Sequence, residues 1–163
     1  MVETQVETNL AEHAISLTRV FDAPRELVWQ AWTRPDQFAA WAGCDGFSVP
    51  LSTIDMDVRP GGRFRWTMIH DESGEQTPAA GIYVEVVEPT RLVYRWEDGR
   101  LAEESIVTIT LTELERDRTE LTLRQVGWTY GALEWGLHAT RTGMAQELDK
   151  LARHLKTAAV QAI

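Results

Sequence analysis

Cysteine is almost missing from this sequence, which has a single one, Cys44, in 163 residues. One cysteine excludes an internal disulfide framework and a cysteine-rich metal site, and it is consistent with a reducing compartment. Histidine is also scarce: the four are scattered, without the spacing of a metal-binding motif. We therefore expect no metal, no cofactor and no cysteine nucleophile.

Positive charge and long apolar runs are lacking as well. The chain has 16 basic against 25 acidic residues, a net charge of −9, which is the wrong sign for binding nucleic acid or an anionic membrane surface. No apolar run reaches the roughly 18 residues that a transmembrane helix needs. The first residues are acidic and polar where a signal peptide would be basic and then apolar. We expect a soluble, cytoplasmic protein that binds neither nucleic acid nor membranes.

The length suits one domain with a single core. We expect residues 1–12 to be a flexible leader and residues 13–163 to form that domain. Alternation of apolar and polar side chains predicts seven strands, over residues 13–21, 51–58, 63–70, 81–88, 91–97, 105–114 and 119–127.

Two short helices are predicted after the first strand, and one long helix at the end. Pro24 and Pro35 each stand where a proline opens a helix. From residues 133 to 159 leucines recur at helical spacing, but the stripe is interrupted at Thr140, Arg141 and Gly143. This order predicts an α+β fold, in which a strongly curved antiparallel sheet wraps around the long C-terminal helix.

Alternation also places apolar side chains on one face of the predicted sheet. The members of this face are Phe64, Trp66, Met68, Ile82, Val84, Val86, Leu92, Tyr94, Trp96, Val107, Ile109, Leu111, Leu121 and Leu123. Seven tryptophans in one domain are a large supply of apolar surface. Two interpretations stay open: the aromatic residues fill a solid core, or the interrupted helix stripe leaves an apolar cavity between helix and sheet.

Four phrases in order carry a family resemblance: FDAPRELVWQAWTRPDQFAAW, DVRPGGRFRWTM, GIYVEVVEPTRLVYRWE and GMAQELDKLARHL. Over about residues 14–156 the chain resembles the helix-grip proteins of the SRPBCC (START-like) superfamily. Within it, the likeness is to the group named after the C-terminal domain of the heat shock protein 90 ATPase activator. The resemblance implies a seven-stranded sheet that grips the C-terminal helix around a deep hydrophobic cavity, usually filled by a lipid-like or aromatic molecule.

The chain departs from the bacterial pattern of that group in two places. Ala42-Gly43-Cys44 follows Trp41 where the group usually has a second tryptophan and Gly-Pro, and Gly143-Met144 replaces a usual Gly-Trp in the terminal helix. Both changes touch the expected rim and wall of the cavity, so they bear on the identity of the ligand more than on the architecture.

The leading hypothesis is a non-enzymatic protein that binds a small hydrophobic ligand between sheet and terminal helix, with no catalytic residues. We expect His70 at a polar rim of this cavity. The expected lining is Trp32, Phe64, Trp66, Met68, Ile82, Val84, Tyr94, Trp96, Val107, Ile109, Leu121, Leu123, Trp135, His138, Ala139, Thr142 and Gly143.

Two other functions stay open at this point. One is a cyclase-like or hydrolase-like enzyme in which His138 or His70 works with Tyr94 on an aromatic or polyketide substrate. The other is a chaperone-associated interaction module, and homodimerisation is compatible with each of the three hypotheses.

Overall fold

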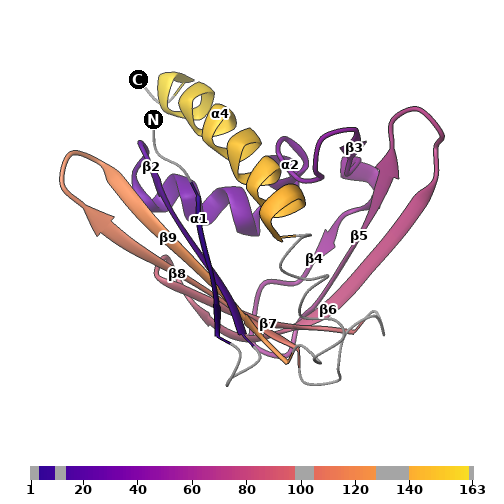
Figure 1. Ribbon diagram of the computed structural model, residues 1–163, viewed down its shortest axis with the longest axis horizontal. Coiled ribbons are helices and arrows are strands. Elements are labelled where there is room, and N and C mark those ends of the chain that lie inside the picture. Colours follow the sequence, from indigo (N-terminus) through magenta and orange to yellow (C-terminus); the bar gives the residue numbers. More distant parts are fainter. Residues whose placement is uncertain (1–3, 10–13, 98–104, 128–139, 162–163) are drawn as a thin grey trace.

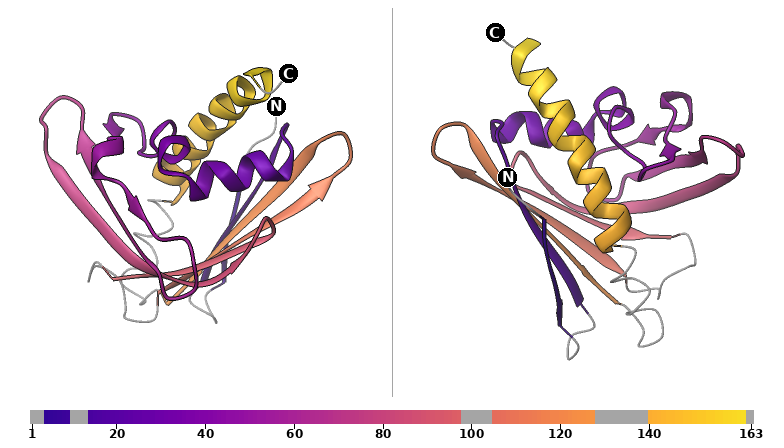
Figure 2. Two further views of the ribbon diagram at one scale, coloured as in Figure 1. Left: turned by 180° about the vertical axis from the view of Figure 1, so that it is seen from behind. Right: turned by 45° about the horizontal axis from the view of Figure 1, so that its top comes forward.

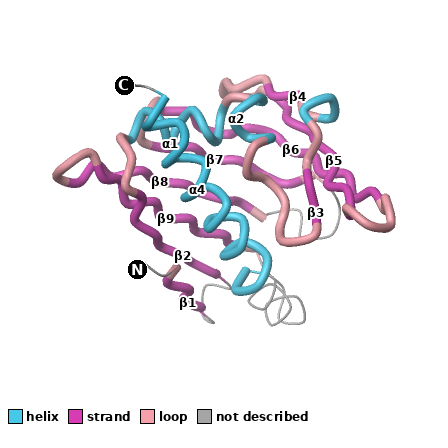
Figure 3. The backbone as a smooth tube through the Cα atoms, turned by 90° about the horizontal axis from the view of Figure 1, so that it is seen from above, coloured by secondary structure: helices cyan, strands magenta, loops and turns pink. Residues whose placement is uncertain are grey.

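The computed structural model of the protein describes residues 4–9, 14–97, 105–127 and 140–161. Its strands form one antiparallel sheet that bends into a V, and the long helix α4 (Ala145–Gln161) lies across the open side of that V (Figure 1). Two shorter helices, α1 (Arg25–Thr33) and α2 (Pro35–Ala39), lie on the same side of the sheet as α4 (Figures 2 and 3). We call the concave face toward these helices the inner face.

The sheet has nine strands within the described residues, in the order β1-β2-β9-β8-β7-β6-β5-β3, with β4 paired to β5. All neighbouring pairs are antiparallel. The strands are β1 (Gln5–Asn9), β2 (Ala14–Phe21), β3 (Phe47–Ser48), β4 (Asp55–Met56), β5 (Arg63–His70), β6 (Gln76–Val87), β7 (Arg91–Trp96), β8 (Ile106–Leu114) and β9 (Arg118–Val126).

The strand count corrects the prediction of seven. The expected flexible leader is wrong for Gln5–Asn9, which forms β1 and pairs with β2. Val6 packs against the core, and Thr4 accepts a hydrogen bond from Arg19, so contacts with the edge of β2 outweigh the polar composition of this segment. Residues 51–58 form the short 3-10 helix η1 (Leu51–Thr53) and the two-residue strand β4 in place of one long strand.

Helix α1 links the sheet to α4. It begins after Pro24, whose missing N–H costs nothing at that position, and it buries Val28, Ala31 and Trp32. The helix packs on β8 and β9 on one side and on α4 on the other. The long helix therefore covers one end of the inner face together with α1.

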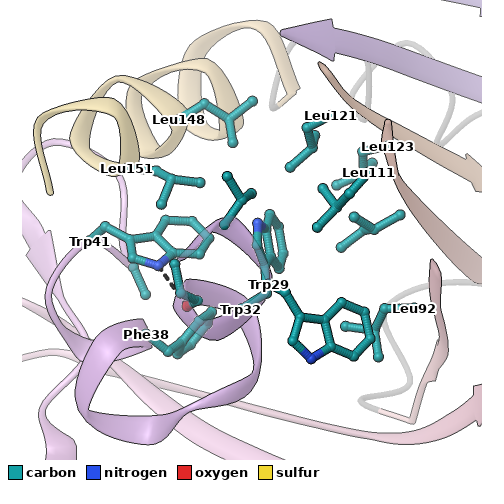
Figure 4. Packing of buried hydrophobic residues seen from close by; sticks show 14 of the residues in the cluster. Trp29, Trp32, Phe38, Trp41, Leu92, Leu111, Leu121, Leu123, Leu148 and Leu151 are labelled. Atoms are coloured by element: carbon teal, nitrogen blue, oxygen red, sulfur yellow. Dashed lines mark hydrogen bonds between the residues drawn. The ribbon is translucent and has the colours of Figure 1, made fainter. Parts of the chain in front are cut away.

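The core lies where these three layers meet. Leu148, Leu151 and Leu155 of α4 are each at most 2% exposed. Figure 4 shows Leu148 and Leu151 pointing toward the region that Leu121 and Leu123 enter from the strands. Their spacing of three and four residues gives α4 the apolar stripe that the sequence predicted.

The predicted alternation fails along β6. The register of β6 against β7 shifts between Tyr83 and Glu85, which is the mark of a β-bulge. Tyr83 is 3% exposed and belongs to the core, whereas Val84 is 50% exposed. Ile82 pairs with two exposed arginines of the outer face. Ile82 and Val84 therefore do not share the inner face with Val86, because the extra residue of the bulge reverses the alternation.

None of the helices in the described parts of the chain combines the length and apolar character needed to span a membrane.

Candidate functional site

A cluster of aromatic rings lies on the inner face where β5, β6 and β7 run side by side. The centroid of the Phe64 ring lies 5.0 Å from that of Trp66, 5.1 Å from Tyr83, 5.3 Å from Tyr94 and 5.5 Å from Trp96. These distances suit stacked and edge-to-face pairs, which add stability beyond the area they bury. We call these five residues the aromatic cluster.

Gly81 of β6 makes this cluster possible. It pairs with Phe64 on one side and with Trp96 on the other, so it occupies the gap between β5 and β7. A Cβ atom at Gly81 would lie 2.3 Å from Cζ of Phe64 and 2.4 Å from the carbonyl oxygen of Arg95. Because no side chain is present, the Phe64 ring lies across β6 and reaches the rings of β7.

The inner face is closed at one end and accessible at the other. Val107, Ile109, Leu121 and Leu123 are at most 4% exposed beneath α1 and α4, so these predicted lining residues belong to the packed core. Trp32, which lies beside Trp41 at a ring distance of 4.8 Å, is buried there too.

At the other end, Trp66, Met68 and Trp96 stay half-buried although they point to the concave side. Phe64 and Tyr94 beneath them are 3% and 6% exposed. The accessible apolar surface of the inner face is therefore concentrated over β5 to β7.

Glu147 brings an ionisable group to the same concavity. It lies one residue before Leu148 and four before Leu151, so it belongs to the inward face of α4. Burial raises the pKa of its carboxyl group to about 7, against a smaller lowering by the charge of Lys150. The side chain nevertheless keeps accessible surface, so the carboxylate is only partly removed from water.

The charge of Glu147 raises the pKa of two other groups, the Tyr94 hydroxyl and the Cys44 thiol. Burial raises the pKa of Tyr94 above its ordinary range, and the nearby phenol of Tyr83 and the charge of Glu147 add to this effect. Burial also raises the pKa of the Cys44 thiol, and Glu147 acts in the same direction. Cys44 therefore stays protonated near neutral pH.

The loop that carries Cys44 is tied to α4. The Lys150 ammonium donates hydrogen bonds to the carbonyl oxygens of Gly43 at 2.7 Å and Phe47 at 3.4 Å. The backbone N–H of Asp45 donates to Oε1 of Gln146 at 3.1 Å. On the opposite flank, Asp149 forms an ion pair with Arg19 of β2. These contacts hold the start of α4 over the concavity.

The interrupted stripe of the terminal helix coincides with a π-helical turn, η2 (Thr140–Met144), directly before α4. A π turn inserts one extra residue, which displaces the apolar positions that follow. Of the expected lining residues here, Thr142 is exposed and Gly143 is half-buried. Trp135, His138 and Ala139 lie outside the described residues.

Replacing Gly143 by alanine tests whether the π-helical turn has room for a side chain at this position. Among described residues, a Cβ atom at Gly143 would have only Cβ of Cys44 within 4 Å, at 3.9 Å, which is an ordinary contact. We expect Gly143→Ala to raise the free energy of unfolding by about 0.5–1 kcal/mol, because alanine loses less backbone entropy in a helix. Urea unfolding measures this, and a loss of stability would show that the turn needs glycine.

Of the two histidines that the enzyme hypothesis names, His138 lies outside the described residues and His70 contacts Phe47 and Ser73. The ring of His70 lies 4.9 Å from that of Phe47, and its Nδ1 accepts a hydrogen bond from the backbone N–H of Ser73 at 3.1 Å. His154 is hydrogen-bonded to Gln37 at 2.7 Å, and burial lowers its pKa. Within the described residues, no group of three or more histidine, cysteine and acidic side chains is placed to hold a metal ion.

Sequence reasoning missed two members of this site. Strict alternation along β6 placed Tyr83 on the outer face, because the sequence does not reveal the bulge after this residue. Glu147 was overlooked because a charged residue on a terminal helix usually faces solvent, yet its spacing from Leu148 and Leu151 marks the inward face.

A curved antiparallel sheet whose concave side holds a long C-terminal helix is the helix-grip architecture. A family model described as "Activator of Hsp90 ATPase homolog 1-like protein" matches residues 22–156. The chain belongs to this family, within the SRPBCC superfamily, as the resemblance in its sequence implied.

Solved structures agree with this assignment. A protein of Nitrosomonas europaea is 26% identical, with a TM-score of 0.80 over 92% of this chain and 98% of its own. A protein of Chromobacterium violaceum is 28% identical, with a TM-score of 0.73 over 87% and 96%. An AHSA1-like protein of Aeromonas hydrophila, 22% identical, shares the fold with a TM-score of 0.69 over 90% and 94%. No curated protein matches.

Proposed function

We propose that this chain is a cytoplasmic, non-catalytic protein that binds a small hydrophobic molecule, lipid-like or aromatic, against the inner face of β5 to β7 beneath α4. The observation that carries this proposal is the accessible surface of Trp66, Met68 and Trp96 on the concave side of a sheet that is otherwise packed. Membership of a superfamily that commonly binds hydrophobic ligands supports it.

The expected driving force is apolar burial. Covering about 100 Å² of apolar surface contributes about 2.5 kcal/mol, whereas micromolar binding needs about 8 kcal/mol. The ligand therefore has to bury at least about 330 Å² of apolar surface between the rings of Trp66 and Trp96 and α4. The rigid rings of the aromatic cluster lose little conformational entropy when they receive it.

Binding is tested by intrinsic tryptophan fluorescence with a panel of fatty acids, sterols and flavonoid-like compounds, together with native mass spectrometry of freshly purified protein. We expect at least one class to bind, and Trp66→Leu to weaken that binding about tenfold. Val87→Ala is the matched control, because Val87 is 46% exposed at the end of β6. A panel without any response, and a protein that retains no small molecule, would contradict the proposal.

A further inference from the structure

The carboxylate of Glu147, on the inward face of α4, has no hydrogen-bonding or ion-pair partner among the described residues. Partial removal of a carboxylate from water without such a partner costs free energy, and charges in protein interiors are usually paired. A bound cation would remove this cost.

The cations of the described chain near this position are already engaged. The Lys150 ammonium donates to two carbonyl oxygens of the loop before β3, and Arg19 is paired with Asp149 on the opposite flank of α4. The other groups coupled to Glu147, Cys44 on that loop and Tyr94 on β7, stay neutral because burial raises the pKa of each. Lys150 therefore acts on Glu147 only through its charge, without a hydrogen bond or ion pair to the carboxylate.

The aromatic cluster, whose member Tyr94 is affected by the charge of Glu147, suits a cation as well as an apolar body. Trp66, Tyr94 and Trp96 present ring faces and edges within one cluster, with Trp66 and Trp96 5.6 Å apart and Tyr94 and Trp96 5.5 Å apart. Faces of tryptophan and tyrosine attract ammonium groups, and such cages recognise organic cations in many proteins. The Tyr94 hydroxyl has no hydrogen-bond partner among the described residues and offers one acceptor.

We infer that the guest of this chain is a hydrophobic amine, whose protonated nitrogen pairs with Glu147 and the Tyr94 hydroxyl while its apolar body covers Trp66 and Trp96. This inference rests on the proposed function and names the chemical class of the ligand. It places the charge of the ligand at the start of α4 and its body along β5 to β7.

The titration of Glu147 also predicts how the affinity for the ligand depends on pH. With a pKa of about 7, the empty site holds a proton on roughly half of its molecules near neutral pH. An ammonium guest requires the ionised carboxylate, so binding releases a proton and tightens as the pH rises through 7. A guest that accepts a hydrogen bond from the protonated acid shows the opposite dependence.

Three probes with one aromatic body separate these outcomes: naphthylethylamine, naphthylethanol and naphthylacetate, titrated by calorimetry at about pH 8 and about pH 5.5. At the higher pH we expect the amine to bind at least about tenfold more tightly than the alcohol. At the lower pH the amine is expected to lose about tenfold in affinity while the alcohol is unchanged.

Glu147→Gln is expected to abolish the preference for the amine but to keep binding of the alcohol, which shows that the variant is folded. Glu115→Gln is the matched control, since it removes the same charge from an exposed turn and should keep the preference. Equal affinity of amine and alcohol in the unaltered protein, or tightest binding of naphthylacetate at about pH 5.5, would overturn the amine inference while the proposed function stands. Failure of all three probes, with a silent ligand panel, would overturn both.

Discussion

Replacing Gly81 by alanine is expected to lower the free energy of unfolding by about 1–3 kcal/mol, because the new methyl group overfills a tightly packed place. The added carbon would meet Cζ of Phe64 at 2.3 Å and the carbonyl oxygen of Arg95 at 2.4 Å. The phenyl ring can rotate away, but the Arg95 carbonyl belongs to the ladder between β6 and β7.

This substitution should also disturb the aromatic cluster, since displacement of Phe64 moves a ring in contact with Trp66, Tyr94 and Trp96. Urea unfolding followed by far-UV circular dichroism measures the stability, and the near-UV spectrum reports the ring packing. Gly143→Ala is the control, because the described chain leaves room for a methyl group there. Equal stability of Gly81→Ala and the unaltered protein would mean that β6 and β7 separate at little cost.

Replacing Glu147 by glutamine should stabilise the ligand-free protein at about pH 8 by about 1–3 kcal/mol and leave it unchanged at about pH 4. In the folded state the pKa of Glu147 is raised from 4.5 to about 7. Between these values the unfolded chain gives up the proton while the folded protein keeps it, so the stability of the unaltered protein falls as the pH rises. The upper limit corresponds to the full shift, and the half-buried position reduces it.

Unfolding free energies of both proteins at several pH values test this prediction. The difference between them is expected to grow from about pH 5 and to level off above about pH 7. Glu115→Gln should change stability by less than about 0.5 kcal/mol throughout, as is usual for an exposed position. A variant that is less stable than the unaltered protein at about pH 8 would show that ionised Glu147 has a stabilising partner.

The strands with strict alternation could be predicted from the sequence. Residues 63–70 were predicted as found, and β7, β8 and β9 are each within one residue at either end. Strand β1 was missed because its five residues contain one apolar side chain, and β3 because two residues carry no pattern. These strands depend on hydrogen bonds to a neighbour, which local sequence does not reveal.

The site was harder to predict than the fold. Phe64, Trp66, Tyr94 and Trp96 were placed correctly on the inner face, since each strand keeps its alternation there. The face of Tyr83 depends on a bulge, and the role of Gly81 depends on a phenyl ring from one neighbouring strand crossing toward the other. The bulge and the ring crossing both depend on how β5, β6 and β7 pair with one another, which the sequence of a single strand does not show.

The two outer strands of the sheet bear on how copies of this protein can associate. β1 has five mostly polar residues, and β3 has only two. Such short, polar borders give an incoming strand few free amide and carbonyl groups to align with, which protects against amyloid-like stacking. These borders favour a homodimer that forms through side chains on the broad surfaces over one that continues the β ladder from one copy into the next.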